Sequence, residues 1–596
     1  MDQNGFTLAE NRTALASIRI PAEDLSNPAS PVLTAAKELR YYLGRITAAS
    51  IPVLAADDPE GPAKAISLGA ASGLDVSSCS EDGFIIEADS DSVKIGGGKR
   101  GVLYGAYDLL ERLGCRFFTP LCEKVPTDPG LSIPPICAKE EPVFEFRRHN
   151  YADIEQYPRF AAKRRFNGAG RIPERLGGNL TYAMHVHTFD QLVPARVYGK
   201  EHPEYFAEVN GQRVTTDGGR TQLCLSNPDV LALVIEKTRE FLRSHPGHRL
   251  MSISQNDWGG NCTCENCKKI DEEEGSSSGT LLRFVNAVAE ALEPEFPDIV
   301  FDTLAYTYSR PAPKYVRNRK NVCVRLCSIE CCFCHPFDAC DDESRGVMRP
   351  DGTRSNFITD LREWGKICDR MYIWDYTTCF AHYPTPHPNW RILARNAQLM
   401  AENNVKGVFE QANGASRGGV DFNELRAYLV SKLLWDPYCD IETHRREFME
   451  YFYGPAAEAL DEYLNLLCDT CEERGDHVGF NDNPLHGFLE EDMLDRYNAL
   501  FDRAAEAVKG DPVRLARVEK NRLSIRWVAL KRKTMLRGEY DAEEINRFFG
   551  DWKAFGLSRI DEWCNVETTH RALLEGKWRG VEYFDHWTGE APEDLG

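Results

Sequence analysis

The sequence predicts an α/β protein built around a (β/α)8 TIM barrel, with a small α/β domain before it and a helical domain after it. Short apolar segments alternate with amphipathic helical segments over residues 143–435, as in successive βαβ units. A Pro-rich linker precedes this region, and the pattern after residue 440 is almost wholly helical. At 596 residues the chain is also too long for one ordinary core.

Residues 1–135 form the predicted small α/β domain. Apolar residues recur at helical spacing over 32–47 and over 100–114, and the second run ends at Gly114, which suits a helix C-terminus. AKAISLGAA and DGFIIEADSDSVKIGGG have the alternation of strands and are interrupted by glycine. The glycines at 96–98 predict a turn, with a phosphate-binding loop as the alternative.

Eight strand candidates in the central region fit a barrel with insertions. They are FEFRRHN, FNGAGRI, TYAMHVHTF, LMSISQND, IVFDTLAY, NVCVRLCSIE, MYIWDY and GVFEQAN. A helix over 279–296 has its apolar positions on one face, and residues 190–245 must hold an insertion before the fourth strand. A doubly wound open sheet is the alternative architecture. The helical domain over 440–596 is expected to support the barrel or an assembly into homo-oligomers.

Charge and composition exclude several classes of function. The formal net charge of −21 argues against a nucleic-acid partner, because phosphate binding needs clustered Lys and Arg. No run of about 18 apolar residues occurs, so we expect no membrane span. The N-terminal residues lack the pattern of a signal peptide, which favours a cytoplasmic protein with reduced thiols. A chain trimmed of its signal would look the same and would be secreted.

The predicted active site lies at the C-terminal ends of the barrel strands, where barrel enzymes place their catalytic side chains. Four carboxylates end late strands, and such groups serve glycosidic cleavage as general acid and second catalytic group. These catalytic candidates are Glu330, Asp257, Asp375 and Glu410. The predicted substrate-binding side chains are Asn256, Trp258, His185, His187, Tyr306, Trp374, Tyr376, Gln411 and His149.

Each of these residues also has a structural alternative. A strand-end carboxylate often caps a helix or forms an ion pair, for example with Arg325 or Arg426. His185 and His187 alternate with apolar residues on one strand face, which suits either substrate binding or the core.

Three cysteines follow the fourth strand with C-x-C-x2-C spacing. Cys262, Cys264 and Cys267 could supply three ligands of a structural zinc site, whose fourth ligand would come from residues 331–340 after the sixth strand. A disulfide between the two loops, or free thiols, are the alternatives. An all-sulfur site is normally structural, so no cofactor is expected to be required for catalysis.

Long segments of the chain resemble a known family. HPEYFAEVNGQRV, QNDWGGNCTCENCKKID, VRLCSIECCFCHPFDACDD, IWDYTTCFAHYPTPHPN and GVFEQAN look like the barrel of glycoside hydrolase family 163, also described as domain of unknown function 4838. DGFIIEADSDSVKIGGGKRGVLYGAYDLLERLGCRFF is similar to the small domain that precedes the barrel in β-hexosaminidases and α-glucuronidases.

This resemblance implies a retaining endo-β-N-acetylglucosaminidase acting on the chitobiose core of N-glycans, with the 2-acetamido oxygen of the substrate as nucleophile. Asn256 and Asp257 resemble the adjacent polar pair of other substrate-assisted hexosaminidases, but Asp stands where those enzymes have Glu. We therefore assign Glu330 as the acid/base and Asp257 as the acetamide partner, with Asp375 and Glu410 as contenders for either role. The alternatives are an inverting α-glucuronidase-like enzyme, which would bind the uronate through Arg147 or Arg148, and a non-catalytic carbohydrate-binding protein.

Overall fold

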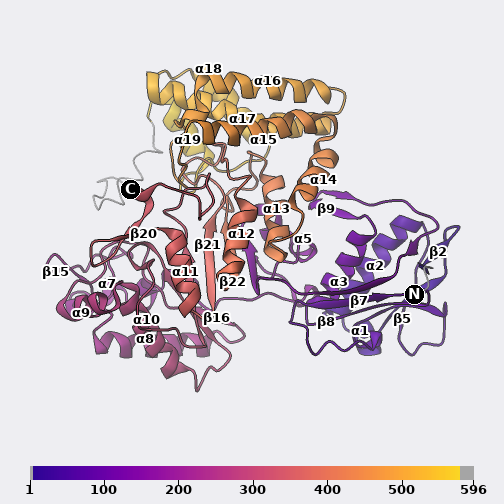
Figure 1. Ribbon diagram of the computed structural model, residues 1–596, viewed down its shortest axis with the longest axis horizontal. Helices are drawn as coiled ribbons and strands as arrows, with labels where there is room; N and C mark the ends of the chain where they lie inside the picture. Colours follow the sequence, from indigo (N-terminus) through magenta and orange to yellow (C-terminus); the bar gives the residue numbers. More distant parts are fainter. Residues whose placement is uncertain (1–4, 578–596) are drawn as a thin grey trace. The chain divides into compact units, whose positions relative to one another are not determined.

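The computed structural model describes residues 5–577, which divide into two compact units (Figure 1). The first unit contains residues 5–179 together with residues 422–457. The second contains residues 180–421 and 458–577. The helices of the first unit that come late in the sequence are α13 (Asn423–Trp435) and α14 (Ile441–Tyr453).

A six-stranded mixed sheet is the centre of the first unit. Its strands follow the order β12, β7, β8, β6, β4, β5, and the four from β8 to β5 run parallel while β7 and β12 are antiparallel to their neighbours. The bounds are β4 (Ala16–Ile20), β5 (Val53–Ala55), β6 (Lys64–Leu68), β7 (Phe84–Ala88), β8 (Ser92–Gly97) and β12 (Ile136–Glu140). Gly96 and Gly97 lie within β8, so of the three glycines predicted to form a turn only Gly98 lies beyond the strand.

Two helices pack against this sheet, and both match the predicted helical runs. In α2 (Pro31–Thr47), the Ser30 hydroxyl accepts hydrogen bonds from the backbone N–H groups of Val32 and Leu33, and Pro31 occupies the first turn. Helix α3 (Gly101–Arg112) is followed by Gly114 at φ +92°, a left-handed conformation that favours glycine. The apolar faces of both helices are buried, which fixes them to the sheet.

Residues 166–172, the second predicted barrel strand, form a series of bends instead of a strand. Asn167 replaces ladder hydrogen bonds with side-chain ones: its Oδ1 accepts from the Arg147 N–H and its Nδ2 donates to Asp82 Oδ2. Gly170 has a φ of +36°, which is incompatible with an extended strand. The first predicted strand forms as β13 (Phe146–His149).

Five parallel strands form the regular sheet of the second unit. They are β16 (Leu250–Ser252), β17 (Val300–Ala305), β18 (Val322–Cys327), β21 (Met371–Tyr376) and β22 (Val405–Gln411), hydrogen-bonded in this order. All five were expected from the sequence at these places. Every residue of β18 is buried, as in a parallel strand covered on both faces. The mixed α/β class with a central parallel sheet is confirmed, and a closed eight-stranded barrel stays a prediction.

The third predicted strand, over 181–189, runs beside β16 without forming a regular ladder. Tyr182 makes a parallel bridge to Leu250, and the Ser252 N–H donates to the Met184 carbonyl oxygen at 3.0 Å. His187 then adopts a φ of +56°, which ends the extended run.

Helices and an insertion surround this sheet. The connecting helices are α8 (Pro228–Ser244), α9 (Glu265–Glu274), α10 (Ser278–Leu292), α11 (Phe357–Ile367) and α12 (Leu393–Glu402). The predicted insertion before β16 contains α6 (Phe189–Leu192), α7 (Ala195–Tyr198) and the short hairpin β14 (Glu208–Val209) and β15 (Gln212–Arg213), followed by α8.

The C-terminal part of the second unit is helical, as the sequence predicts (Figure 1, orange to yellow). Its helices are α15 (Ala457–Glu473), α16 (Glu491–Ala507), α17 (Pro512–Arg532), α18 (Ala542–Ala554) and α19 (Val566–Leu574). Their core includes Trp527, Phe549 and Ile560 and also Val420, which follows β22. The tail therefore packs on the chain that leaves the parallel sheet. None of the helices within residues 5–577 has the length and apolarity that crossing a bilayer requires.

Candidate active site

A cavity of about 410 Å³ lies beyond the C-terminal ends of β17, β18, β21 and β22. We call it the Asp257 cavity. Its lining residues are His187, Asp257, Leu304, Tyr306, Cys327, Ile329, Trp374, Tyr376, Phe380, Gln411, Phe480, Asn481, Glu562 and Trp563. Six of the fourteen are aromatic, and flat rings suit the apolar faces of sugar rings. The remaining polar groups are few and convergent, as in binding sites for small polar ligands.

Strand alternation decides which side chains reach this cavity. Trp374 and Tyr376 are two residues apart on β21 and therefore point to the same face. On the neighbouring strand Gln411 points the same way, and Trp374 Nε1 donates a hydrogen bond to its Oε1 at 2.7 Å. Asp375, between the two aromatic residues, points to the opposite face.

Asp257 is presented by the chain beyond β16. Its side chain is exposed in the cavity, and the Tyr306 hydroxyl donates a hydrogen bond to Asp257 Oδ1 at 2.8 Å. Burial, together with the nearby Asp257 carboxylate, raises the pKa of Tyr306 well above its usual value, so the phenol keeps the proton that it donates.

Glu562 is a second carboxyl group in the same cavity, and sequence reasoning missed it. It lies in the loop between α18 and α19, within the region predicted only as helical support. Gln411 Nε2 donates to Glu562 Oε1 at 3.1 Å. Burial and then the negative charge of Asp257 raise the pKa of Glu562 to about 7. The adjoining Trp563, in a segment without helical periodicity, was the available sequence signal.

Glu330 lines a neighbouring cavity of about 510 Å³, which shares Ile329, Phe480 and Asn481 with the Asp257 cavity. Its Oε2 lies 2.9 Å from Nη1 of the buried Arg310, whose Nε also contacts Asp360 at 2.8 Å. Burial raises the pKa of Glu330, and the Arg310 guanidinium opposes that shift. Glu330 is therefore beside the Asp257 cavity and held in an ion pair.

Asp375 and Glu410, the other two catalytic candidates, lie side by side on the face of the sheet away from the cavity. They are register partners on β21 and β22, and both are buried. The Ser328 hydroxyl donates to Asp375 Oδ1, whereas Glu410 Oε2 has no hydrogen-bond partner among the described residues. Burial raises the pKa of Asp375 to about 6, and burial with the Asp375 charge raises the pKa of Glu410 well above its usual value.

Some of the predicted substrate-binding residues line the Asp257 cavity, and others lie outside it. His187 lines the Asp257 cavity, with its Nδ1 2.9 Å from the Gln255 carbonyl oxygen. The His185 ring lies 6.0 Å from the Trp374 ring, between centroids, and outside the lining. His149 belongs to the first unit, where it is buried against Tyr151 and Phe166.

Asn256 and Trp258, which flank Asp257, hold the insertion in place and do not line the cavity. Asn256 Oδ1 accepts from the Asp190 N–H at 2.9 Å, and Asn256 Nδ2 donates to the Thr221 carbonyl oxygen at 2.7 Å. The Trp258 carbonyl accepts a hydrogen bond from Gln222 Nε2. Both neighbours therefore fix the position from which Asp257 enters the cavity.

The model of a protein family described as "Domain of unknown function (DUF4838)" matches residues 117–465, more than half of the chain. The chain belongs to the DUF4838 family. This confirms the family resemblance by that description, and the narrower resemblance to glycoside hydrolase family 163 stays a prediction. No curated protein sequence matches this DUF4838 chain.

Solved structures similar to this DUF4838 chain include several glycoside hydrolases. CpGH84B is 11% identical, with 94% of this chain and 96% of that one covered and a TM-score of 0.43. The GH20 β-N-acetylhexosaminidase of Streptomyces coelicolor A3(2) is 13% identical, with 76% and 93% covered and a TM-score of 0.41. CpGH89 of Clostridium perfringens is 12% identical, with 89% and 66% covered and a TM-score of 0.48. These likenesses are too remote to assign an activity, which has to be argued from the site.

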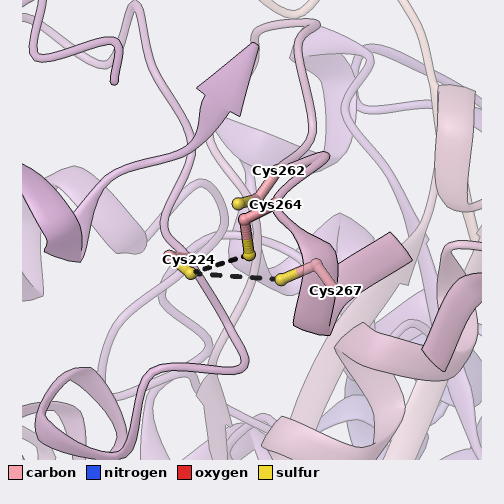
Figure 2. Close-up of side chains that lie close together, drawn as sticks. All are labelled: Cys224, Cys262, Cys264 and Cys267. Carbon is pink, nitrogen blue, oxygen red and sulfur yellow. Dashed lines mark hydrogen bonds between the residues drawn. The ribbon is translucent and has the colours of Figure 1, made fainter. Parts of the chain in front are cut away.

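The three cysteines of the C-x-C-x2-C segment lie together with a fourth, Cys224, near the insertion of this DUF4838 chain (Figure 2). The four Sγ atoms lie within 4.8 Å of one another, and all four residues are buried. The predicted fourth ligand from residues 331–340 is thus replaced by Cys224, which precedes α8. Those later residues form a separate cluster with His477, made of Cys332, His335, Cys340 and His477.

Proposed function

We propose that this protein is a glycoside hydrolase, and more narrowly a retaining β-N-acetylglucosaminidase that uses the 2-acetamido group of its substrate as nucleophile. One observation carries the proposal: an aromatic cavity holds two carboxyl groups in different surroundings. Burial and the charge of Asp257 raise the pKa of Glu562 to about 7, whereas Asp257 accepts a hydrogen bond from the Tyr306 hydroxyl.

The proposed catalytic roles of Glu562 and Asp257 follow from these surroundings. Protonated Glu562 donates to the glycosidic oxygen as that bond breaks, and later takes a proton from water. Charged Asp257, held by Tyr306, orients the acetamide N–H and stabilises the positive charge of the oxazolinium intermediate. Glu330, the acid/base predicted from the sequence, is the second contender for the proton-donor role from its neighbouring cavity.

The shared walls of the two cavities support an endo-type enzyme acting on N-glycan-like chains. A terminal sugar would need only one enclosed pocket, whereas Ile329, Phe480 and Asn481 border both spaces. The Glu330 cavity would then hold the sugars that flank the cleaved bond.

The α-glucuronidase alternative receives less support from the side chains. The lining of the Asp257 cavity, as far as the described residues show, has no Lys or Arg to pair with a uronate. The sequence suggested Arg147 or Arg148 for that role. Arg147 is buried and forms an ion pair with Asp82 at 2.9 Å, and Arg148 forms one with Glu155 at 3.3 Å.

A hydrolysis screen over N-glycans with a chitobiose core, aryl N-acetylglucosaminides and aryl glucuronides tests the proposal, with the anomer of the product followed by NMR. We expect release of the β-anomer from N-acetylglucosaminides and inhibition by a thiazoline analogue of the oxazoline. Cleavage of uronides alone would exclude the N-acetylglucosaminidase. Binding of glycans without turnover of any substrate would indicate a carbohydrate-binding protein.

A further inference from the structure

We propose that each of two side-chain clusters in the second unit binds one structural zinc ion. The first, here the four-cysteine cluster, consists of Cys224, Cys262, Cys264 and Cys267. The second, here the Cys–His cluster, consists of Cys332, His335, Cys340 and His477. Neither cluster lines the Asp257 cavity, and each has the four side-chain ligands of a closed structural site.

Sulfur–sulfur distances in the four-cysteine cluster match tetrahedral zinc coordination. Zn–S bonds of about 2.3 Å place two sulfur ligands about 3.8 Å apart at the tetrahedral angle. Cys224 Sγ lies 3.7 Å from Cys264 Sγ and 4.0 Å from Cys267 Sγ (Figure 2). A disulfide would bring one pair to about 2.05 Å, and all four cysteines are free.

Hydrogen-bond donors around these sulfur atoms suit thiolate ligands. The Glu208 N–H donates to Cys262 Sγ at 3.3 Å, and Arg213 Nη1 lies 3.7 Å from the same sulfur. Cys264 precedes the first residue of α9 and Cys267 is in its first turn, where the helix dipole favours negative charge. Donors to ligand sulfur atoms are the outer partners that metal sites normally have.

The apolar core around this part of the insertion is small. The buried core beside β14 and β15 consists of Ala207 and the four cysteines, with Val209 partly buried against it. Small lobes with so little apolar core are usually stabilised by disulfides or a metal. A zinc ion here would tie the insertion to the chain that follows Asp257.

Distances in the Cys–His cluster fit a mixed sulfur–nitrogen site. With Zn–S and Zn–N bonds of about 2.3 and 2.05 Å, a sulfur and a nitrogen ligand lie about 3.6 Å apart. Cys340 Sγ is 3.6 Å from His477 Nδ1, and Cys332 Sγ is 3.3 Å from His335 Nδ1. The neighbouring Cys334 Sγ also lies 3.2 Å from Cys332 Sγ and 3.5 Å from His335 Nδ1, but its thiol is directed to the Asp476 carbonyl oxygen at 3.1 Å. We therefore assign the four ligands to the residues of the Cys–His cluster.

An independent feature at His477 supports this second ion. Its other ring nitrogen, Nε2, lies 3.4 Å from Asp341 Oδ1. A carboxylate on the far nitrogen of a histidine ligand is a common arrangement that fixes the ring and its tautomer. The ion would join the loop that carries Glu330 to the chain after α15, whose Gly479–Asp482 stretch lines the neighbouring cavity.

Counting zinc in the purified chain tests both sites without reference to activity. Native mass spectrometry and elemental analysis of protein produced with zinc in the medium should give two ions per wild-type chain. Cys224→Ser and Cys340→Ser should each give one, and the double variant none. The control Cys137→Ser replaces an exposed cysteine outside both clusters and should keep two.

The wild-type protein provides a second readout if a variant does not fold. Chelation should remove both ions, expose the six ligand thiols to alkylation and lower the thermal midpoint, and added zinc but not magnesium should reverse these changes. A wild-type chain that carries no zinc and takes up none after chelation and zinc addition would overturn the proposal. A chain with one ion that Cys340→Ser does not release would overturn the second site.

Discussion

Glu562 lies half-buried beside a second carboxyl group, and both circumstances disfavour its charged form. Asp257 faces the same space but receives a proton-donating contact from Tyr306. The chemical difference between two similar side chains therefore comes from their neighbours. This difference also sets the direction in which activity should change with pH.

The first prediction concerns the proton on Glu562. Because a general acid acts in its protonated form, kcat should fall as the pH rises through about 7, the pKa of Glu562. Glu562→Gln should lower kcat by about 10²- to 10⁴-fold on a glycan substrate and remove this decline at high pH. An aryl glycoside with a good leaving group should be affected less. Rates from pH 4 to 9 measure both effects.

Glu330→Gln is the matched control, because Glu330 also has a raised pKa but is held by Arg310 outside the Asp257 cavity. It should keep the decline above pH 7. If Glu330→Gln removes that decline while Glu562→Gln keeps it, the proton donor is Glu330 and our assignment is wrong.

The second prediction concerns the hydrogen bond between Tyr306 and Asp257. Tyr306→Phe removes the donor to a charged acceptor, worth about 1.5–3 kcal/mol, so kcat/KM should fall about 10-fold or more. Tyr182→Phe removes a similar hydroxyl that contacts Asp302 at 3.1 Å outside the cavity lining, and it should leave kcat/KM unchanged. Equal losses in both variants would point to a general effect on folding.

At the scale of elements, the alternation within a strand separates residues that the sequence places together. The strands themselves were predictable, because short apolar runs bounded by turns marked β16, β17, β18, β21 and β22. Treating Trp374, Asp375 and Tyr376 all as cavity residues was inconsistent with that alternation, since neighbouring strand residues point to opposite faces. The aromatic pair Trp374 and Tyr376 could have predicted which face of β21 lines the cavity.

Other parts of the site depend on contacts that no local pattern contains. Cys224 lies 40 residues before Cys264, and Gln411 contacts Glu562 across 151 residues. Residues 166–172 failed as a strand because the Asn167 side chain satisfies backbone groups that a ladder would otherwise use. Apolar periodicity describes burial, and it carries no information about such long-range polar partners.

The third prediction concerns the buried pair on the other face of the sheet. The pKa of Asp375 is about 6 in the folded state and about 3.9 in an unfolded chain. The folded state therefore binds the proton more tightly, so stability falls as the pH rises from about 4 through 6. Asp375→Asn should remove this penalty and stabilise the protein by about 1–3 kcal/mol at pH 8, with little change at pH 4. Urea unfolding at both pH values measures it.

Asp298→Asn, at an exposed position, is the control and should change stability little at either pH. Asp375→Asn should also retain kcat, because its side chain lies on the face away from the cavity. A large loss of kcat with unchanged unfolding at both pH values would indicate that Asp375 acts in catalysis.

At the scale of the whole molecule, the helical tail supplies part of the candidate active site as well as support. The Glu562 N–H donates to the Phe380 carbonyl oxygen at 3.0 Å, and the Tyr383 N–H donates to the Ile560 carbonyl oxygen at 2.8 Å. These bonds connect the loop that carries Glu562 to the chain that leaves β21. Placement of Glu562, the proposed proton donor, thus depends on the core of the tail helices.

A comparison of two isoleucines in that core is the fourth prediction. Ile560 and Ile545 are both fully buried in the same cluster, so each change to Ala should cost about 2–5 kcal/mol of stability. Ile560 lies two residues from Glu562, and the cavity left by its truncation would let the loop shift. Ile545 is within α18, away from that loop. Ile560→Ala should therefore lower kcat and move the decline at high pH, whereas Ile545→Ala, assayed well below its unfolding midpoint, should lower stability alone. If both variants keep wild-type kcat and pH dependence, the tail supports the fold without positioning the proton donor, and Glu330 becomes the better candidate for that role.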